Sequence, residues 1–236
     1  MDWTDEGIVL SVRSLGETSV VATLLTRDHG RHAGMIRGGG SKTARAALQP
    51  GNRLQVVWKA RLTEQLGSFA WDLLAATGAL WLGDPLRLAA VSAACAMVAV
   101  LPEREPHPAA YHGLDALLGA LADDGWPGLY ARWELGLLGE MGYGIDLSQC
   151  AVTGRTDDLA YVSPKSGRAV GREAGESYRD RLLPLPGFLL DRSVGTRPEV
   201  VAALRLSGYF FERHVLGPQG RALPPARSRL VDRLQA

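Results

Sequence analysis

The sequence is poor in cysteine, with only Cys95 and Cys150 among its 236 residues. Two cysteines in separate segments provide no disulfide framework, which fits the reducing cytosol. The N-terminal residues are acidic and lack the basic and then apolar order of a signal peptide. The longest apolar run, residues 88–101, is shorter than the roughly 20 residues needed to cross a bilayer. We therefore expect a cytoplasmic protein rather than a secreted or membrane-spanning one.

The sequence also lacks a catalytic constellation. Its paired acids, at residues 123–124 and 157–158, adjoin turn residues and fit capping or solvated turns better than general acid-base catalysis. The glycine-rich residues 38–43 end in Gly-Ser-Lys-Thr, in which a serine separates the glycine from the lysine, so they do not match a nucleotide-binding phosphate loop. We therefore predict neither an enzyme nor a bound cofactor.

Positive charge is concentrated in residues 27–61, although the formal net charge of the whole chain is only +1. The stretch contains a single acid, Asp28, and eight basic residues: Arg27, Arg31, Arg37, Lys42, Arg45, Arg53, Lys59 and Arg61. Such a surface suits nucleic acid, because each Lys or Arg that meets a phosphate releases a condensed counterion. A charged strand face is also commonly just solvated, so charge by itself leaves both interpretations open.

Short β-strands are predicted at residues 7–13, 19–27, 31–37, 52–62 and 67–74, where β-branched and alternating runs are separated by turn residues. In the fourth, a period of two predicts a core face made of Leu54, Val56, Trp58, Ala60 and Leu62. The five-stranded antiparallel barrel most often used for nucleic acid is the OB-fold, which we expect here. Residues 38–43 would then be a mobile connector between two strands.

The basic residues of the third and fourth strands fall on the face opposite the core, and the glycine-rich connector extends them. The predicted DNA-binding residues are Arg31, Arg37, Lys42, Arg45, Arg53, Lys59 and Arg61. His29 and His32 flank a turn and are expected to be solvated, without a metal role.

Helices are predicted at residues 86–101, 109–122, 127–141 and 196–216, the last opened by a Thr-x-x-Glu capping box. We therefore expect an α+β multidomain chain, with an OB-fold DNA-binding domain at residues 1–80 and a helical domain at residues 81–236. Residues 221–233 are basic again, and could extend a DNA footprint, dock an acidic partner or form a frayed end.

Residues 150–175 have the layout of a zinc knuckle, with two turns around a short strand pair. A structural zinc ion needs four thiolate or imidazole ligands. Only Cys150 is present, and Thr153, Gly171 and Ala174 stand where the other ligands would be. We therefore expect a degenerate, metal-free zinc-finger-like segment at about residues 146–176, with Cys150 as the sole remaining candidate ligand.

Several short motifs, in this order and spacing, resemble the RecO family of bacterial recombination mediators over essentially the full chain. They are the Glu-Gly-Ile-Val-Leu start at residues 6–10, the turn at 16–19, Arg-Gly-Gly-Gly-Ser at 37–41, Pro-Gly at 50–51, Met-Gly-Tyr at 141–143, Cys-Ala-Val-Thr-Gly at 150–154 and Tyr-Val-Ser-Pro-Lys-Ser-Gly at 161–167. Many members of the family keep four cysteines around a zinc ion, and this chain departs from that pattern at three positions.

The resemblance implies a function in DNA repair and homologous recombination by the RecF pathway. It implies binding of single- and double-stranded DNA without sequence preference, annealing of complementary strands, and loading of RecA together with RecR. It also implies binding of the C-terminal tail of single-stranded-DNA-binding protein by the helical domain, and a nucleoid-associated location. The alternatives are an RNA-binding barrel protein of translation or RNA processing, and a metal-dependent nuclease or ligase.

Overall fold

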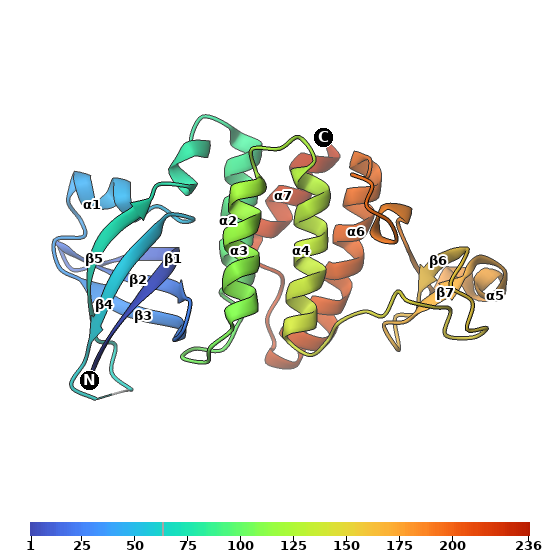
Figure 1. Cartoon of the computed structure of the whole chain (residues 1–236), viewed down its shortest axis with the longest axis horizontal. Coiled ribbons are helices and arrows are strands. Elements are labelled where there is room, and N and C mark those ends of the chain that lie inside the picture. Colours follow the sequence, from blue (N-terminus) through green and yellow to red (C-terminus); the bar gives the residue numbers. More distant parts are fainter. Residues whose placement is uncertain (63) are drawn as a thin grey trace. The chain divides into compact units, whose positions relative to one another are not determined.

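The N-terminal part of the chain folds into a closed five-stranded barrel. The computed structural model describes residues 1–62 and 64–236. The barrel has the strand order β1-β2-β3-β5-β4, with helix α1 between β3 and β4 in the chain (Figure 1). Its elements are β1 (Asp2–Leu15), β2 (Ser19–Thr26), β3 (Gly30–Ile36), α1 (Lys42–Ala47), β4 (Arg53–Lys59) and β5 (Ser68–Ala75). The prediction of a five-stranded barrel is confirmed.

The alternation of β4 places the predicted apolar face inside the barrel. Leu54, Val56 and Trp58 are almost completely buried and form one cluster with side chains of the other strands. The strand ends at Lys59, so the prediction was wrong for Leu62, which is 57% exposed. β1 is longer than predicted because its first half pairs with β4 and its second half with β2, with a bulge between Val9 and Ser11.

Residues 38–43 are not the mobile connector that their glycines predicted. A turn covers residues 37–40, and Ser41 then caps α1 by accepting a hydrogen bond from the Ala44 backbone N–H, at 3.2 Å. Ala44 and Leu48 belong to the apolar cluster of the barrel interior. The helix forms because this burial adds to the cap and to the high helix propensity of alanine. Lys42 and Arg45 therefore lie on a helix.

Two helices belong to the same compact unit as the barrel, which comprises residues Met1–Leu121 and Pro224–Leu230. They are α2 (Pro85–Val98) and α3 (Pro108–Ala120), preceded by the short helix η1 (Gly78–Trp81). α2 packs against β1, and the Cys95 thiol lies 3.6 Å from the Val9 carbonyl oxygen. Burial raises the pKa of Cys95 to about 12, so this cysteine is an unreactive core residue. The first unit thus extends beyond residue 80, at which the sequence analysis placed the boundary between the barrel and the helical domain.

The second compact unit comprises Ala122–Leu223 and Val231–Ala236. Its long helices are α4 (Trp126–Glu140) and α6 (Arg197–Phe210), which continues as the π-helical turn η4 (Phe211–Leu216). The predicted capping box is confirmed, because Thr196 and Glu199 bond each other's backbone and side-chain groups. A small sheet has the order β7-β6-β8. The remaining elements are β6 (Leu159–Val162), β7 (Ala169–Gly171), α5 (Arg172–Gly175), η2 (Glu176–Arg181), β8 (Leu183–Pro184), η3 (Gly187–Leu189) and η5 (Gly217–Gln219).

The basic C-terminal residues form the helix α7 (Pro225–Gln235), which contributes to both units. Leu230 and Leu234 on this helix are buried, so the C-terminal stretch is not a frayed end. Among the helices of the described residues, none has the length and apolar composition that crossing a membrane requires.

Candidate nucleic-acid interface

The seven predicted DNA-binding residues fall into two classes, those held in ion pairs and those that are exposed and unpaired. Arg31 belongs to the first class. Its Nε donates to the Leu101 carbonyl oxygen at 2.7 Å, and its Nη1 lies 3.0 Å from Glu103 Oε1. The backbones of Arg31 and Glu103 also form a β-bridge. Arg31 therefore fastens β3 to the segment that follows α2.

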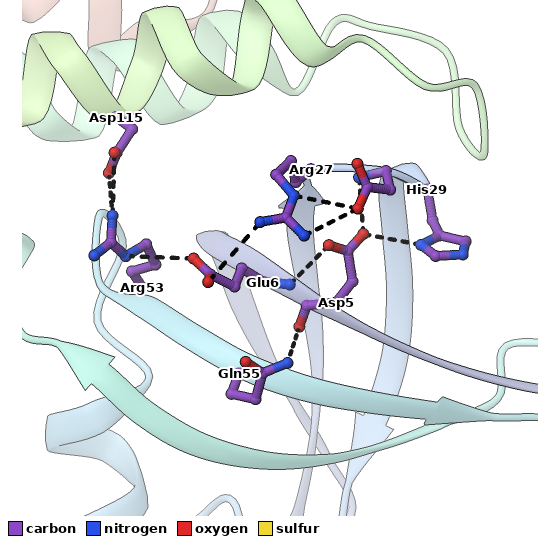
Figure 2. Close-up of polar contacts among 8 residues, drawn as sticks. Asp5, Glu6, Arg27, His29, Arg53, Gln55 and Asp115 are labelled. Carbon is purple, nitrogen blue, oxygen red and sulfur yellow. Dashed lines mark hydrogen bonds and ion pairs between the residues drawn. The ribbon is translucent and has the colours of Figure 1, made fainter.

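Arg53 is also held within the first unit. Its Nη1 lies 3.1 Å from a carboxylate oxygen of Asp115 on α3, and its Nε lies 3.9 Å from Glu6 on β1. Figure 2 shows that Glu6 in turn faces Arg27, which is paired with Asp28 at 3.1 Å. The Asp28 hydrogen bond and charge raise the pKa of Arg27. The positive charges of Arg27 and Arg53 are thus compensated by neighbouring carboxylates.

Arg37, Lys42 and Arg45 are exposed at one end of the barrel. Within the described residues, no carboxylate lies at ion-pair distance from any of the three. The turn before α1 is tied to the β1–β2 turn by a hydrogen bond from the Gly40 N–H to the Thr18 carbonyl oxygen, at 3.0 Å. A cavity of about 450 Å³ lies between these turns and α1, and Arg45 and Glu17 both line it. This end of the barrel offers several cations to an anionic ligand.

Arg13 is a further exposed cation near that end, which the sequence analysis missed because it precedes the dense basic stretch. Arg13 of β1 pairs with Val21 of β2, and Val21 pairs with Met35 of β3, one residue before the end of that strand. The strand register therefore brings Arg13 towards Arg37. The alternation of β1 was the available signal, since it places Val12 against the core and Arg13 outside.

Lys59 and Arg61 are exposed at the end of β4. They line a second cavity of about 450 Å³ together with Met1, Asp2 and Ala60. Lys59 stands opposite Asp2 across the β1–β4 pair, and no ion pair of the described residues involves Lys59 or Arg61. The predicted basic surface therefore consists of two exposed groups of cations. Arg31 and Arg53 belong to neither group, because both are held in ion pairs with other elements.

The prediction that His29 and His32 are solvated was wrong for His32 and only partly right for His29, whose side chain is 34% exposed. His29 Nδ1 lies 2.8 Å from an oxygen of Asp5, whose carboxylate is fully buried. His32 is 6% exposed, and burial lowers its pKa, so the ring is neutral at pH 7. Asp5 was missed because an acid in an N-terminal strand looks solvated until the turn at Asp28 folds over it.

The 146–176 segment brings together three of the four positions at which zinc ligands would stand. The Gly171 N–H donates to Cys150 Sγ at 3.2 Å, and hydrogen bonding by Thr153 favours the thiolate form of the same cysteine. Burial opposes ionisation of Cys150, but these hydrogen bonds outweigh it and lower the pKa of the thiol to about 7. Within residues 1–62 and 64–236, no three His, Cys, Asp or Glu side chains gather as a metal site would need. The residues present do not fit a structural zinc ion.

Comparison with known proteins identifies the family. Residues 1–73 match the family described as Recombination protein O N terminal, and residues 82–222 match Recombination protein O C terminal. The DNA repair protein RecO of Rhodospirillum centenum is 56% identical over 236 residues, covering 99% of this chain and 94% of the relative. That of Rhodospirillum rubrum is 53% identical over 244 residues, covering 100% and 97%. Because both domains match and the relatives align over nearly their whole length, the chain belongs to the RecO family of DNA repair proteins.

Proposed function

We propose that this protein is a non-enzymatic mediator of DNA repair and homologous recombination that binds DNA through its N-terminal barrel. The observation that carries this proposal is the presence of two exposed cation groups on the barrel, which form no ion pair among the described residues, in a chain of the RecO family. Cations that no carboxylate compensates keep their full attraction for phosphates, and they release condensed counterions when they bind.

The barrel is proposed to be an OB-fold domain. Its strand order β1-β2-β3-β5-β4, the parallel contact between β3 and β5, and the helix between β3 and β4 support this assignment. Residues 1–80 would be the DNA-binding domain and residues 81–236 the helical domain. The 146–176 segment is proposed to be a metal-free derivative of a zinc finger, since Cys150, Thr153 and Gly171 meet there.

DNA would lie on the exposed basic groups rather than on all seven predicted residues equally. Arg37, Lys42 and Arg45 form one phosphate-binding group, and Lys59 and Arg61 form the other. Arg31 and Arg53 are secondary, because a phosphate would have to displace the carboxylates of Glu103 or Asp115. Contacts of this kind are made to the backbone and carry no sequence information, so single- and double-stranded DNA would both bind.

Annealing follows from the same electrostatics. Strands whose phosphates are neutralised approach each other with less repulsion, and base pairing then drives their union. Partnership with RecR, loading of RecA and binding of the tail of single-stranded-DNA-binding protein are proposed from family membership. The protein would then act in the cytoplasm, associated with the nucleoid.

The experiment that tests this function is an annealing assay with complementary oligonucleotides, with and without single-stranded-DNA-binding protein. We expect the protein to accelerate annealing in both conditions. A protein that binds RNA more tightly than DNA of equal length, and does not anneal DNA, would instead be an RNA-binding barrel protein.

A further inference from the structure

Three aromatic rings form a column from the interior of the barrel to its surface. The rings of Trp58 and Trp3 are 5.6 Å apart with an interplanar angle of 16°, and those of Trp3 and His29 are 4.1 Å apart at 6°. Trp58 is 1% exposed, Trp3 is partly buried, and the side chain of His29 is 34% exposed. The column therefore ends on an imidazole ring that is partly open to solvent.

The orientation of that last ring is fixed by polar contacts. The Asp5 carboxylate lies 2.8 Å from His29 Nδ1 through one oxygen, and accepts hydrogen bonds from the backbone N–H groups of Glu6 and Asp28, each at 2.8 Å. Figure 2 shows His29 at the end of this chain of contacts, beyond Asp5. Because Asp5 is itself immobilised, little rotational freedom of the His29 ring remains to be lost when a ligand binds.

The inner part of the column is equally constrained. His32 meets Trp3 edge-on at 5.0 Å and Trp58 edge-on at 5.3 Å, so a third ring blocks sideways movement of both indoles. Lys59 and Arg61, which belong to the second exposed cation group, come one and three residues after Trp58 in the chain, and Lys59 pairs across the sheet with the residue before Trp3. The two indoles and Lys59 thus lie on the paired strands β1 and β4, and His29 reaches the column from the turn between β2 and β3.

We propose that the open face of His29 is a stacking platform for a nucleobase of single-stranded DNA, with the adjacent phosphates held by Lys59 and Arg61. This inference rests on the proposed DNA-binding function and deepens it. Every base presents an aromatic face, so stacking tolerates any sequence, as a general annealing protein requires. Bases within a duplex are stacked on each other, so this contact distinguishes single strands from double strands.

The competing explanation is that His29 only closes the end of the barrel by holding Asp5. Both explanations predict some loss of thermal stability when the ring is removed. Only the stacking platform predicts that the loss of affinity depends on the presence of bases in the DNA. The comparison of a normal strand with an abasic strand of the same length therefore separates them.

The test measures binding of an oligothymidine of about 15 nucleotides and of an abasic phosphodiester strand of equal length, for the wild type and three full-length variants. In His29→Ala, the preference for the strand with bases should fall roughly fivefold or more, while affinity for the abasic strand stays unchanged. His29→Phe should restore the preference, because it restores an aromatic face. His112→Ala, which removes an exposed histidine of α3, is the matched control and should leave both affinities unchanged.

A second measurement needs no variant. The imidazole C–H protons of His29 should move upfield in the NMR spectrum when the wild type binds oligothymidine, and should not do so with the abasic strand. An unchanged base preference in folded His29→Ala, or no upfield shift, overturns the platform. Failure of the wild type to bind either strand would instead refute the proposed DNA-binding function.

Discussion

Replacing Arg37, Lys42 and Arg45 together by Gln should weaken single-stranded DNA binding mainly at low salt. Each phosphate contact contributes about 0.7 to the slope of log affinity against log salt concentration for single strands, so losing three contacts lowers the slope by about 2. Between 50 and 200 mM salt, the fall in affinity should therefore be about 20-fold smaller in the variant than in the wild type. Binding anisotropy of a labelled oligonucleotide across a salt series measures this slope.

The fold of that variant should be intact, because all three side chains are exposed and take part in no ion pair of the described residues. A matched control changes the same charge in the second unit, by replacing Arg155, Arg172 and Arg179 with Gln. These arginines are exposed and paired with carboxylates at 2.7, 3.1 and 3.5 Å. An unchanged slope in the first variant would show that this end of the barrel does not bind DNA, and an equal fall in the control would show that total charge is responsible.

Three further predictions follow from single contacts. Arg53→Ala should lower the free energy of unfolding by less than about 1 kcal/mol, because the side chains of Arg53 and Asp115 are 35% and 39% exposed. The same change should leave the salt dependence of DNA binding nearly unchanged. Chemical denaturation measures the first effect and the salt series measures the second. Burial lowers the pKa of His32 in the folded protein, so below pH 6.5 the unfolded chain binds more protons than the folded one. Acid should therefore destabilise the wild type more than His32→Gln. Melting temperatures of both proteins between pH 7.5 and 5.5 measure this difference. Metal analysis of the purified protein should find no stoichiometric zinc; one zinc ion per chain would refute the view that Cys150 is the sole remaining ligand.

The barrel could be predicted from the sequence because the features that specify its strands lie within each strand and the adjacent turns. Alternation along residues 53–59 and the turn residues between strands are readable one segment at a time. The ion pairs of Arg31 and Arg53 could not be predicted in this way, because their partners Glu103 and Asp115 come 72 and 62 residues later in the chain. A basic side chain on an exposed strand looks the same whether or not a distant carboxylate will fold against it.

Helix α1 and the Asp5 site were missed for a related reason. The glycines at residues 38–40 correctly indicate a turn, but the helix after it is stabilised by burial of Ala44 and Leu48 in a barrel that must already exist. Asp5 is a buried carboxylate satisfied by groups from the β2–β3 turn, which a one-dimensional pattern cannot place beside it. The assignment of the 146–176 segment as a metal-free zinc finger rests on local turns and on a direct count of candidate ligands, and it stays a prediction.

The two classes of arginine explain how a chain with a net charge of +1 can still expose groups of basic side chains. Charges on Arg31 and Arg53 are compensated within 4 Å and contribute little to the field outside the protein. They hold β3 to the segment after α2 and β4 to α3, and so keep the barrel and these elements together. Arg37, Lys42, Arg45, Lys59 and Arg61, which form no ion pair with any residue of 1–62 or 64–236, are then presented on a rigid support. Under the proposed function, stability and DNA binding would use the same kind of residue, and the nearest carboxylate would determine which of the two each arginine serves.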